Sequence, residues 1–341
     1  MGDSYIAGNA GRWLGNSDTP FGNRSGTDRA VDANGNYDLT KVYGQTAGKC
    51  FRSDTAEIKM AGVSADHSIN LACSGAESKN IWRASHGGET LENEQPQADQ
   101  LAKVAAAKNV QLIVLSIGGN DIGFGDILAK CMTSFMNPFG SQCNKDQEKI
   151  VDARMANSML GVDKAVKEIR GVMNSAGYNA SQYRLVLQSY PSPLPRSSEM
   201  RYAESGGDRI YHGCPMYNAD LDWARNVLMP KITAELKTVA KINKTEFLDL
   251  SDALAGREVC AKSTQLADST HPPLATKSEW ARYFNTGLLQ GALEDSLHPN
   301  AFGQRALGTC LKNLQKASPG LWKCKNTPGA ATDTMPLYSI N

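Results

Sequence analysis

The sequence predicts an α/β protein in which a parallel sheet carries helices on both faces. Two observations lead to this class. From about residue 67 onward, short apolar runs alternate with longer segments of helical periodicity, as expected for strands joined by helical crossovers. The run VQLIVLSI at 110–117 is nearly all apolar, which is typical of a central strand buried on both faces.

Each element is assigned from its own pattern, in chain order. Gly2 suits a tight turn and Asp3 or Ser4 can cap a helix, so residues 1–8 predict a strand end, a turn and a helix start. Apolar residues at helical spacing predict helices at 43–60 (interrupted at Cys50), 97–109, 152–176, 221–243 (kinked at Pro230) and 302–317. Short apolar runs predict strands at 67–73, 110–117, 183–190 and 247–250.

Long polar excursions separate these elements. Residues 9–49, 194–218 and 255–293 lack periodicity and are rich in loop-forming residues. They lie at or near strand ends, so we expect them to gather around one site. Residues 325–341 are expected to be a mostly irregular tail, which leaves 1–324 as a single domain. No apolar run precedes Gly2, so the first strand of the sheet is expected to be lacking.

Composition excludes several classes of protein. The 341 residues carry 36 basic and 35 acidic side chains, and a net charge of +1 gives no footprint for nucleic acid. No apolar run approaches the roughly 20 residues of a membrane helix, so we expect no transmembrane segment. Five histidines are too few for a His-rich metal site. We expect a monomer.

The cysteines indicate disulfide bonds. All eight are dispersed, and none stands in a CxxC pair. An even, dispersed set favours an oxidising compartment and a secreted, extracellular protein. The alternative is eight buried thiols in a cytosolic enzyme. Many pairings are possible, and the simplest joins sequence neighbours. Those pairs are Cys50 with Cys73, Cys131 with Cys143, Cys214 with Cys260, and Cys310 with Cys324.

Three short stretches offer the groups that acyl transfer requires, namely an activated hydroxyl, a base, a group that orients the base, and oxyanion donors. The stretches are GDS at 2–4, GGND at 118–121 and DSLHP at 295–299. Each alone has a simpler interpretation, since GDS can cap a helix, GGND can be a turn, and a histidine before proline is often a packing residue. Their order along the chain favours a joint site.

The candidate residues have distinct roles in such a site. Ser4 is the candidate nucleophile, and His298 is the base that takes its proton and returns it to the leaving group. Asp295 lies three residues before His298 and can fix the imidazole tautomer. The Ser4 N–H, the Gly75 N–H and the Asn120 side-chain amide are the candidate oxyanion donors.

With the Gly75 turn in NLACSGA, these stretches stand in an order that resembles the SGNH (GDSL-type) hydrolase family over residues 2 to about 315. The resemblance implies a three-layer, flavodoxin-like α/β/α fold with long loop insertions, and ester hydrolysis through an acyl-enzyme. It also implies the triad Ser4, Asp295 and His298, and an oxyanion hole formed by Ser4, Gly75 and Asn120. No metal or organic cofactor is implied. In some similar members a backbone carbonyl orients the histidine, so two orienting groups stay open.

The chain is most similar to the secreted actinobacterial members of that family, which implies a disulfide between Cys50 and Cys73. The expected substrate is a small-molecule, lipid or polysaccharide ester, in an esterase, lipase, phospholipase or deacetylase reaction. Two other hypotheses stay open. One is an acyltransferase that uses the same triad with an alcohol acceptor, and the other is a catalytically idle binding module on the hydrolase fold.

Overall fold

The computed structural model describes residues 1–19, 21–44, 48–285 and 290–341. At its centre is a five-stranded sheet whose strands follow one another in sequence order. Four strands run parallel, namely β1 (Leu112–Leu115), β2 (Arg184–Gln188), β3 (Glu246–Asp252) and β4 (Leu321–Lys325). The last strand, β5 (Leu337–Ser339), is antiparallel to β4. The predicted α/β class with a mainly parallel sheet is therefore confirmed.

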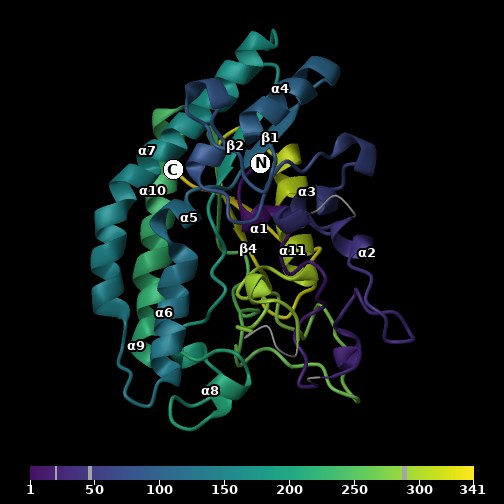
Figure 1. Ribbon diagram of the computed structural model, residues 1–341, viewed down its shortest axis with the longest axis vertical. Coiled ribbons are helices and arrows are strands. Elements are labelled where there is room, and N and C mark those ends of the chain that lie inside the picture. Colours follow the sequence, from purple (N-terminus) through teal and green to yellow (C-terminus); the bar gives the residue numbers. More distant parts are fainter. Residues whose placement is uncertain (20, 45–47, 286–289) are drawn as a thin grey trace.

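Helices cover both faces of the sheet and make three layers (Figure 1). On one side α10 (Met229–Ile242) packs on β2 and β3, and α7 (Asn144–Ser175) packs against α10 and α4 (Gln97–Ala107). On the other side α11 (Ala301–Lys316) packs against α3 (Glu57–Met60). The strands between these layers are buried because both of their faces carry apolar side chains.

The remaining helices, apart from α6 (Phe124–Met136), have four to six residues. They are α1 (Ser4–Ala7), α2 (Thr40–Tyr43), α5 (Gly119–Ile122), α8 (Asp208–Tyr211) and α9 (Asn218–Trp223). Single 3₁₀ turns lie at Arg24–Gly26, Gly48–Cys50, Ala65–His67, Ser78–Asn80, Ala84–His86, Ser197–Glu199 and Leu293–Asp295. The turns at Arg24–Gly26 and Ser197–Glu199 lie within the excursions.

Two predicted elements of the first half are wrong. The helix expected over 43–60 is replaced by α2 and α3 with irregular chain between them, and residues 45–47 lie outside the described part. Gly44 ends α2 at φ +74°, and the Cys50–Cys73 disulfide holds the chain after it. The strand expected over 67–73 is irregular, because its backbone bonds to side chains and to the Gly2 region instead of a ladder.

The predicted kink at Pro230 takes another form. A π-helical turn, η7 (Ala224–Leu228), joins α9 to α10, and Pro230 stands in the first turn of α10. Proline has no N–H to donate and is tolerated in a first helical turn. The wider turn before it therefore replaces a sharp break.

The segment 325–341, expected to be a mostly irregular tail, is irregular over most of its length but contributes Lys325 of β4 and strand β5 to the sheet. Phe247 pairs with Leu321 and Leu248 pairs with Trp322. Because β4 extends to Lys325, the domain boundary expected at residue 324 falls inside this strand. The buried Cys324 is bonded to Cys310 of α11, which holds the strand against the helix layer. The segment LWKCK alternates lysines with apolar residues, and its pairing depends on partners distant in sequence.

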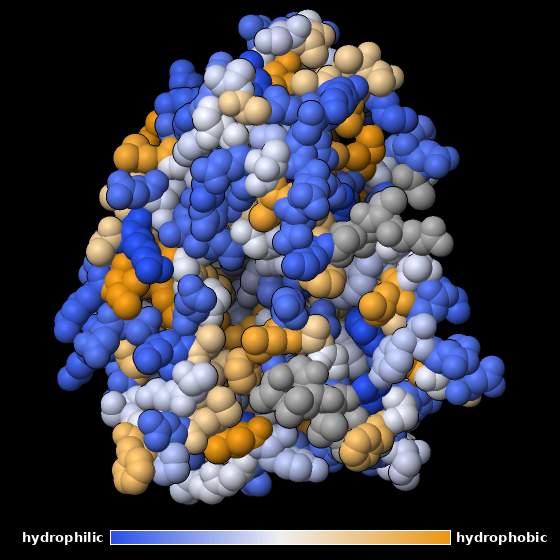
Figure 2. Space-filling model, in the orientation of Figure 1, coloured by the Kyte–Doolittle hydropathy of each residue, from blue (hydrophilic) through white to orange (hydrophobic). Residues whose placement is uncertain are grey.

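Residues 1–3 extend the sheet beyond β1. Gly2 forms a parallel bridge with Ser116, and the Met1 ammonium donates to Val114 O at 2.9 Å. The N–H and the carbonyl of Gly2 both bond the Gln97 side chain, which accepts from Gly2 N–H at 2.7 Å and donates to Gly2 O at 2.8 Å. These residues thus take the place of the strand expected to be lacking. Beyond Met1, the outer edge of β1 borders a cavity of about 740 Å³ with apolar side chains between α4 and α3 (Figure 2).

Four disulfides join sequence neighbours, as the simplest pairing predicts. The first joins the 3₁₀ turn that ends at Cys50 to Cys73 beside the Gly75 turn, and the last joins α11 to β4. Within the described residues, no helix is both long and apolar enough to cross a membrane.

Candidate active site

Ser4 stands at the carboxyl edge of the parallel sheet, where open α/β sheets place their ligand sites. It follows the Gly2–Ser116 bridge directly and is the first residue of α1. Asp3 caps this short helix by accepting from Tyr5 N–H at 3.1 Å. Gly2 has φ +135°, and a Cβ there would lie 1.9 Å from Ser116 O, so the turn requires glycine.

His298 lies against Ser4. The distance from Ser4 Oγ to His298 Nε2 is 2.7 Å, and His298 Nδ1 lies 2.9 Å from Ser296 O. A carbonyl oxygen can only accept, so the proton resides on Nδ1 and leaves Nε2 free to accept the Ser4 hydroxyl proton. Asn300 caps α11 with its side chain, accepting from Phe302 N–H and Gly303 N–H, and thereby fixes the chain just after His298.

The structure corrects the expected role of Asp295. Its carboxylate faces away from the imidazole and accepts from Ala10 N–H at 3.1 Å, Trp13 Nε1–H at 3.1 Å and Tyr43 O–H at 3.4 Å. The orienting contact on His298 Nδ1 belongs to Ser296 O instead. The backbone around His298 explains this contact. Residues 293–295 form a 3₁₀ turn and Leu297 has φ +60°, and this conformation presents the Ser296 carbonyl to the ring.

Burial sets the charge of His298. Removal from water lowers the pKa of His298 to about 4, while the Ser296 carbonyl and the charge of Asp295 act in the opposite direction. The imidazole is therefore neutral at neutral pH, which is the state that can accept a proton. The Asp295 carboxylate acts on the ring through its charge, while its hydrogen bonds go to Ala10, Trp13 and Tyr43.

Two hydrogen bonds join the segments that carry the candidate oxyanion residues. Cys73 N–H donates to Gly2 O at 3.0 Å, which brings the Gly75 turn beside the GDS stretch. Gly75 has φ +79°, and its N–H has no acceptor within the described chain. Asn120 Nδ2 donates to Ala76 O at 2.9 Å, which leaves one amide hydrogen for another acceptor.

Asp121 shapes this region. Its carboxylate accepts from Ser78 N–H at 2.9 Å and Ser78 Oγ–H at 2.5 Å, and so joins the Gly75 segment to the start of α5. Tyr190 and Tyr5, which sequence reasoning missed, also contact the site. Tyr190 is the last residue of the predicted strand at 183–190, so its place at a carboxyl strand end was the available signal.

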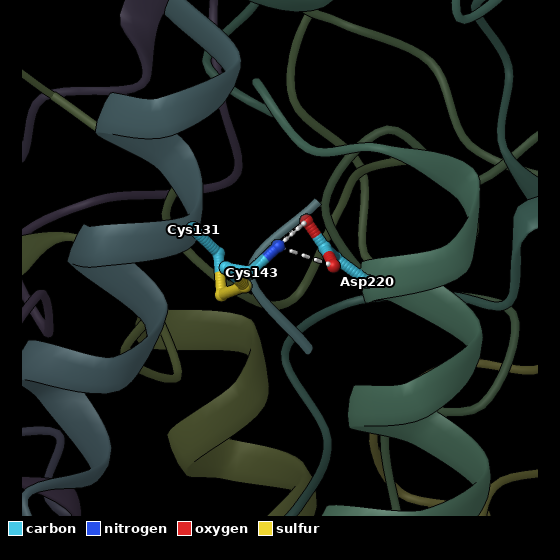
Figure 3. A group of neighbouring side chains, drawn as sticks. All are labelled: Cys131, Cys143 and Asp220. Atoms are coloured by element: carbon cyan, nitrogen blue, oxygen red, sulfur yellow. Dashed lines mark hydrogen bonds between the residues drawn. A yellow bond between two sulfur atoms is a disulfide. The ribbon is translucent and has the colours of Figure 1, made fainter. Parts of the chain in front are cut away.

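One further cluster combines potential metal ligands. Cys131, Cys143 and Asp220 lie together, and Figure 3 shows that the two sulfurs form a disulfide while the carboxylate faces the Cys143 backbone. Asp220 accepts from Cys143 N–H and Asn144 N–H, each at 3.0 Å, at the start of α7. The cluster is therefore a helix cap beside a disulfide, with no thiolate to bind a metal.

A serine hydroxyl bonded to a neutral imidazole at the carboxyl edge of a parallel sheet is the arrangement typical of α/β serine hydrolases. The chain belongs to the GDSL-like lipase/acylhydrolase family, whose model matches residues 1–306. It is accordingly a carboxylic ester hydrolase.

Individual relatives are distant. An esterase from Streptomyces scabiei is 21% identical over 274 residues, which cover 73% of this chain and 78% of the relative. An extracellular lipase from Streptomyces rimosus has a TM-score of 0.47 and 21% identity, with 93% of this chain and 97% of that chain covered. A phospholipase A1 from Streptomyces albidoflavus NA297 has a TM-score of 0.49 and 20% identity at the same coverage.

Proposed function

We propose that the protein is a secreted serine esterase that works through an acyl-enzyme, with Ser4 as nucleophile and His298 as general base. The observation that carries this proposal is the 2.7 Å contact between Ser4 Oγ and His298 Nε2, with the other ring nitrogen held by Ser296 O. The four disulfides support secretion, because such bonds persist in oxidising compartments.

The reaction follows from this geometry. Ser4 Oγ attacks the ester carbonyl carbon while its proton passes to His298 Nε2. The oxyanion accepts hydrogen bonds from Ser4 N–H, Gly75 N–H and the Asn120 amide. The tetrahedral intermediate collapses, the C–O bond to the alcohol breaks, and His298 returns the proton to that oxygen. Water then attacks the carbonyl carbon of the acyl-enzyme while its proton passes to His298 Nε2. The bond to Ser4 Oγ breaks, His298 returns the proton to that oxygen, and the acid is released.

Lipid, acyl or acetyl esters fit this mechanism equally. Figure 2 shows that the face carrying α1 is hollowed near its middle, and apolar side chains border the hollow. An apolar border suits the hydrocarbon part of an acyl group. We therefore expect activity on esters with an apolar acyl group.

Covalent labelling tests the proposal. A fluorophosphonate probe should label the wild-type protein and a Ser181→Ala control, whose serine is exposed and bonded to Asn179, but not Ser4→Ala. Hydrolysis of a p-nitrophenyl ester series should disappear in the same variant. A folded wild-type protein that neither labels nor hydrolyses any ester would contradict the proposal and favour an idle fold.

A further inference from the structure

Tyr190 joins two parts of the candidate site through one oxygen atom. It follows β2 and is 4% exposed. Its hydroxyl accepts from Gly119 N–H at 3.0 Å and donates to Asp3 Oδ2 at 2.5 Å. Gly119 directly precedes Asn120, and Asp3 directly precedes Ser4. One buried hydroxyl therefore lies between the backbone that carries the nucleophile and the backbone that carries an oxyanion donor.

On the oxyanion side, Tyr190 completes the start of a helix. Gly119 is the first residue of α5, and the first N–H groups of a helix have no partner within the helix. The Tyr190 oxygen supplies that partner. The ring also packs directly on this turn, since a Cβ at Gly119 would lie 3.1 Å from Tyr190 Cζ. The position of Asn120 is thus coupled to Tyr190 by a hydrogen bond and by packing.

On the nucleophile side, Tyr190 completes the bonding of Asp3. Asp3 is 2% exposed, and its two oxygens accept from Tyr5 N–H and Tyr190 O–H. Both partners donate, which fits an ionised carboxylate. Burial raises the pKa of Asp3 to about 7, and the Tyr190 donor opposes that change. Removing the Tyr190 oxygen would leave a buried carboxylate with one donor fewer.

The contacts continue to the base. The Tyr5 ring lies edge-on to Tyr190 at 5.3 Å and tilted on the His298 ring at 4.8 Å. Tyr5 O–H donates to Leu297 O at 3.0 Å, in the residue before His298. Nucleophile, base and oxyanion turn therefore share one buried set of contacts.

We propose that Tyr190 is a positioning residue of the esterase reaction, whose hydroxyl fixes the separation between Ser4 and the Asn120 amide. This inference rests on the proposed function. Oxyanion contacts strengthen in the transition state, so an error in that separation lowers kcat more than it changes KM.

The test is Tyr190→Phe, which keeps the ring and removes only the oxygen. The matched control is Tyr178→Phe, because Tyr178 O–H also accepts a backbone N–H (Val110, 3.0 Å) and donates to an oxygen (Lys108 O, 2.8 Å), near the opposite end of β1. On p-nitrophenyl butyrate we expect kcat of Tyr190→Phe to fall on the order of 10-fold or more, with KM within about twofold. Tyr178→Phe should keep both constants within about twofold.

A double-mutant cycle separates positioning from general destabilisation. If Tyr190 acts through the Asn120 turn, Tyr190→Phe should cost much less in an Asn120→Ala background than in the wild type. Equal losses in both backgrounds, or a kcat for Tyr190→Phe equal to that of Tyr178→Phe, would overturn the inference.

Two further variants keep the test decisive. If Tyr190→Phe does not fold, Asp3→Asn takes its place in the same cycle. Tyr5 N–H and Tyr190 O–H bind different oxygens of Asp3, and asparagine replaces one of these oxygens by an NH2 donor. Asp3→Asn should give the same kcat loss and the same non-additivity, and additive losses would refute the positioning role. Full activity in Ser4→Ala would instead contradict the proposed function. An inactive Ser4→Ala together with a normal Tyr190→Phe would contradict only this inference.

Discussion

His298 Nδ1 lies 2.9 Å from the backbone oxygen of Ser296, two residues earlier in the chain. The group that orients the candidate base is therefore part of the main chain and cannot be removed by substitution. A side chain three residues away, Asp295, is left free to bond Ala10, Trp13 and Tyr43. This division of roles leads to the first prediction.

We expect Asp295→Asn to reduce kcat by less than about 10-fold, whereas His298→Ala should reduce it by at least about 1,000-fold. Asparagine at position 295 keeps one oxygen that can accept from Ala10, Trp13 or Tyr43, but it removes the negative charge near the imidazole. In a triad whose acid holds the histidine, the same change costs about 10,000-fold. A loss of that size, measured with a p-nitrophenyl ester, would return the orienting role to Asp295.

The activity should persist to lower pH than an exposed histidine allows. The base must be neutral to accept the Ser4 proton, and burial lowers the pKa of His298 to about 4. We therefore expect kcat/KM to stay near its plateau down to about pH 5 and to fall as pH approaches 4. A histidine with an ordinary pKa would instead give a fall below about pH 6 to 7. A midpoint near 6.5 would mean that water reaches the ring.

Asn120→Ala should lower kcat on the order of 100-fold or more with little change in KM, because the lost donor serves the oxyanion. The matched control is Asn313→Ala. Asn313 Nδ2 donates to a backbone carbonyl, Met335 O, at 2.8 Å, as Asn120 does to Ala76 O, but far from the site. An unchanged kcat in Asn120→Ala would exclude this amide from the oxyanion hole.

The Cys310–Cys324 disulfide should stabilise the fold. It spans 14 residues and joins α11, whose N-terminus follows His298, to strand β4, which lies between β3 and β5. In the chain-entropy model, replacing both cysteines by alanine should lower the free energy of unfolding by about 3 kcal/mol. Urea unfolding measures this change. Thiol titration of the denatured, unreduced wild type should find no free cysteine, and eight reactive thiols would contradict the disulfides and the argument for secretion.

The sequence predicts the first three strands of the sheet well and the last two strands poorly. Strands β1, β2 and β3 are predictable because each contains a short group of apolar residues, namely LIVL in β1, LVL in β2, and Phe247, Leu248 and Leu250 in β3. Strands β4 and β5 are not, because Lys323 and Lys325 interrupt the pattern and pairing depends on β3 and on Cys310. Local pattern therefore suffices where a strand is buried on both faces, and fails at the sheet edge.

The site divides in the same way. Ser4 and His298 could be paired from the order of the short stretches in which they stand. The direction of the Asp295 carboxylate depends on Trp13, which is 282 residues away in sequence and lies in an irregular excursion. The contacts of Tyr190 depend likewise on how β2 is placed beside α1 and α5. Such relationships arise only in the folded chain.

The pairing of Gln97 with Gly2 has a consequence for protein engineering. An amide side chain on α4 imitates a neighbouring peptide group, offering one donor and one acceptor to the backbone just before Ser4. A glutamate at 97 would place an acceptor against the Gly2 carbonyl, and a leucine would leave the Gly2 N–H without a partner and the Gly2 carbonyl with only the Cys73 N–H. Any attempt to transplant a different nucleophile turn into this scaffold must therefore redesign positions 2 and 97 as a unit, although they lie 95 residues apart.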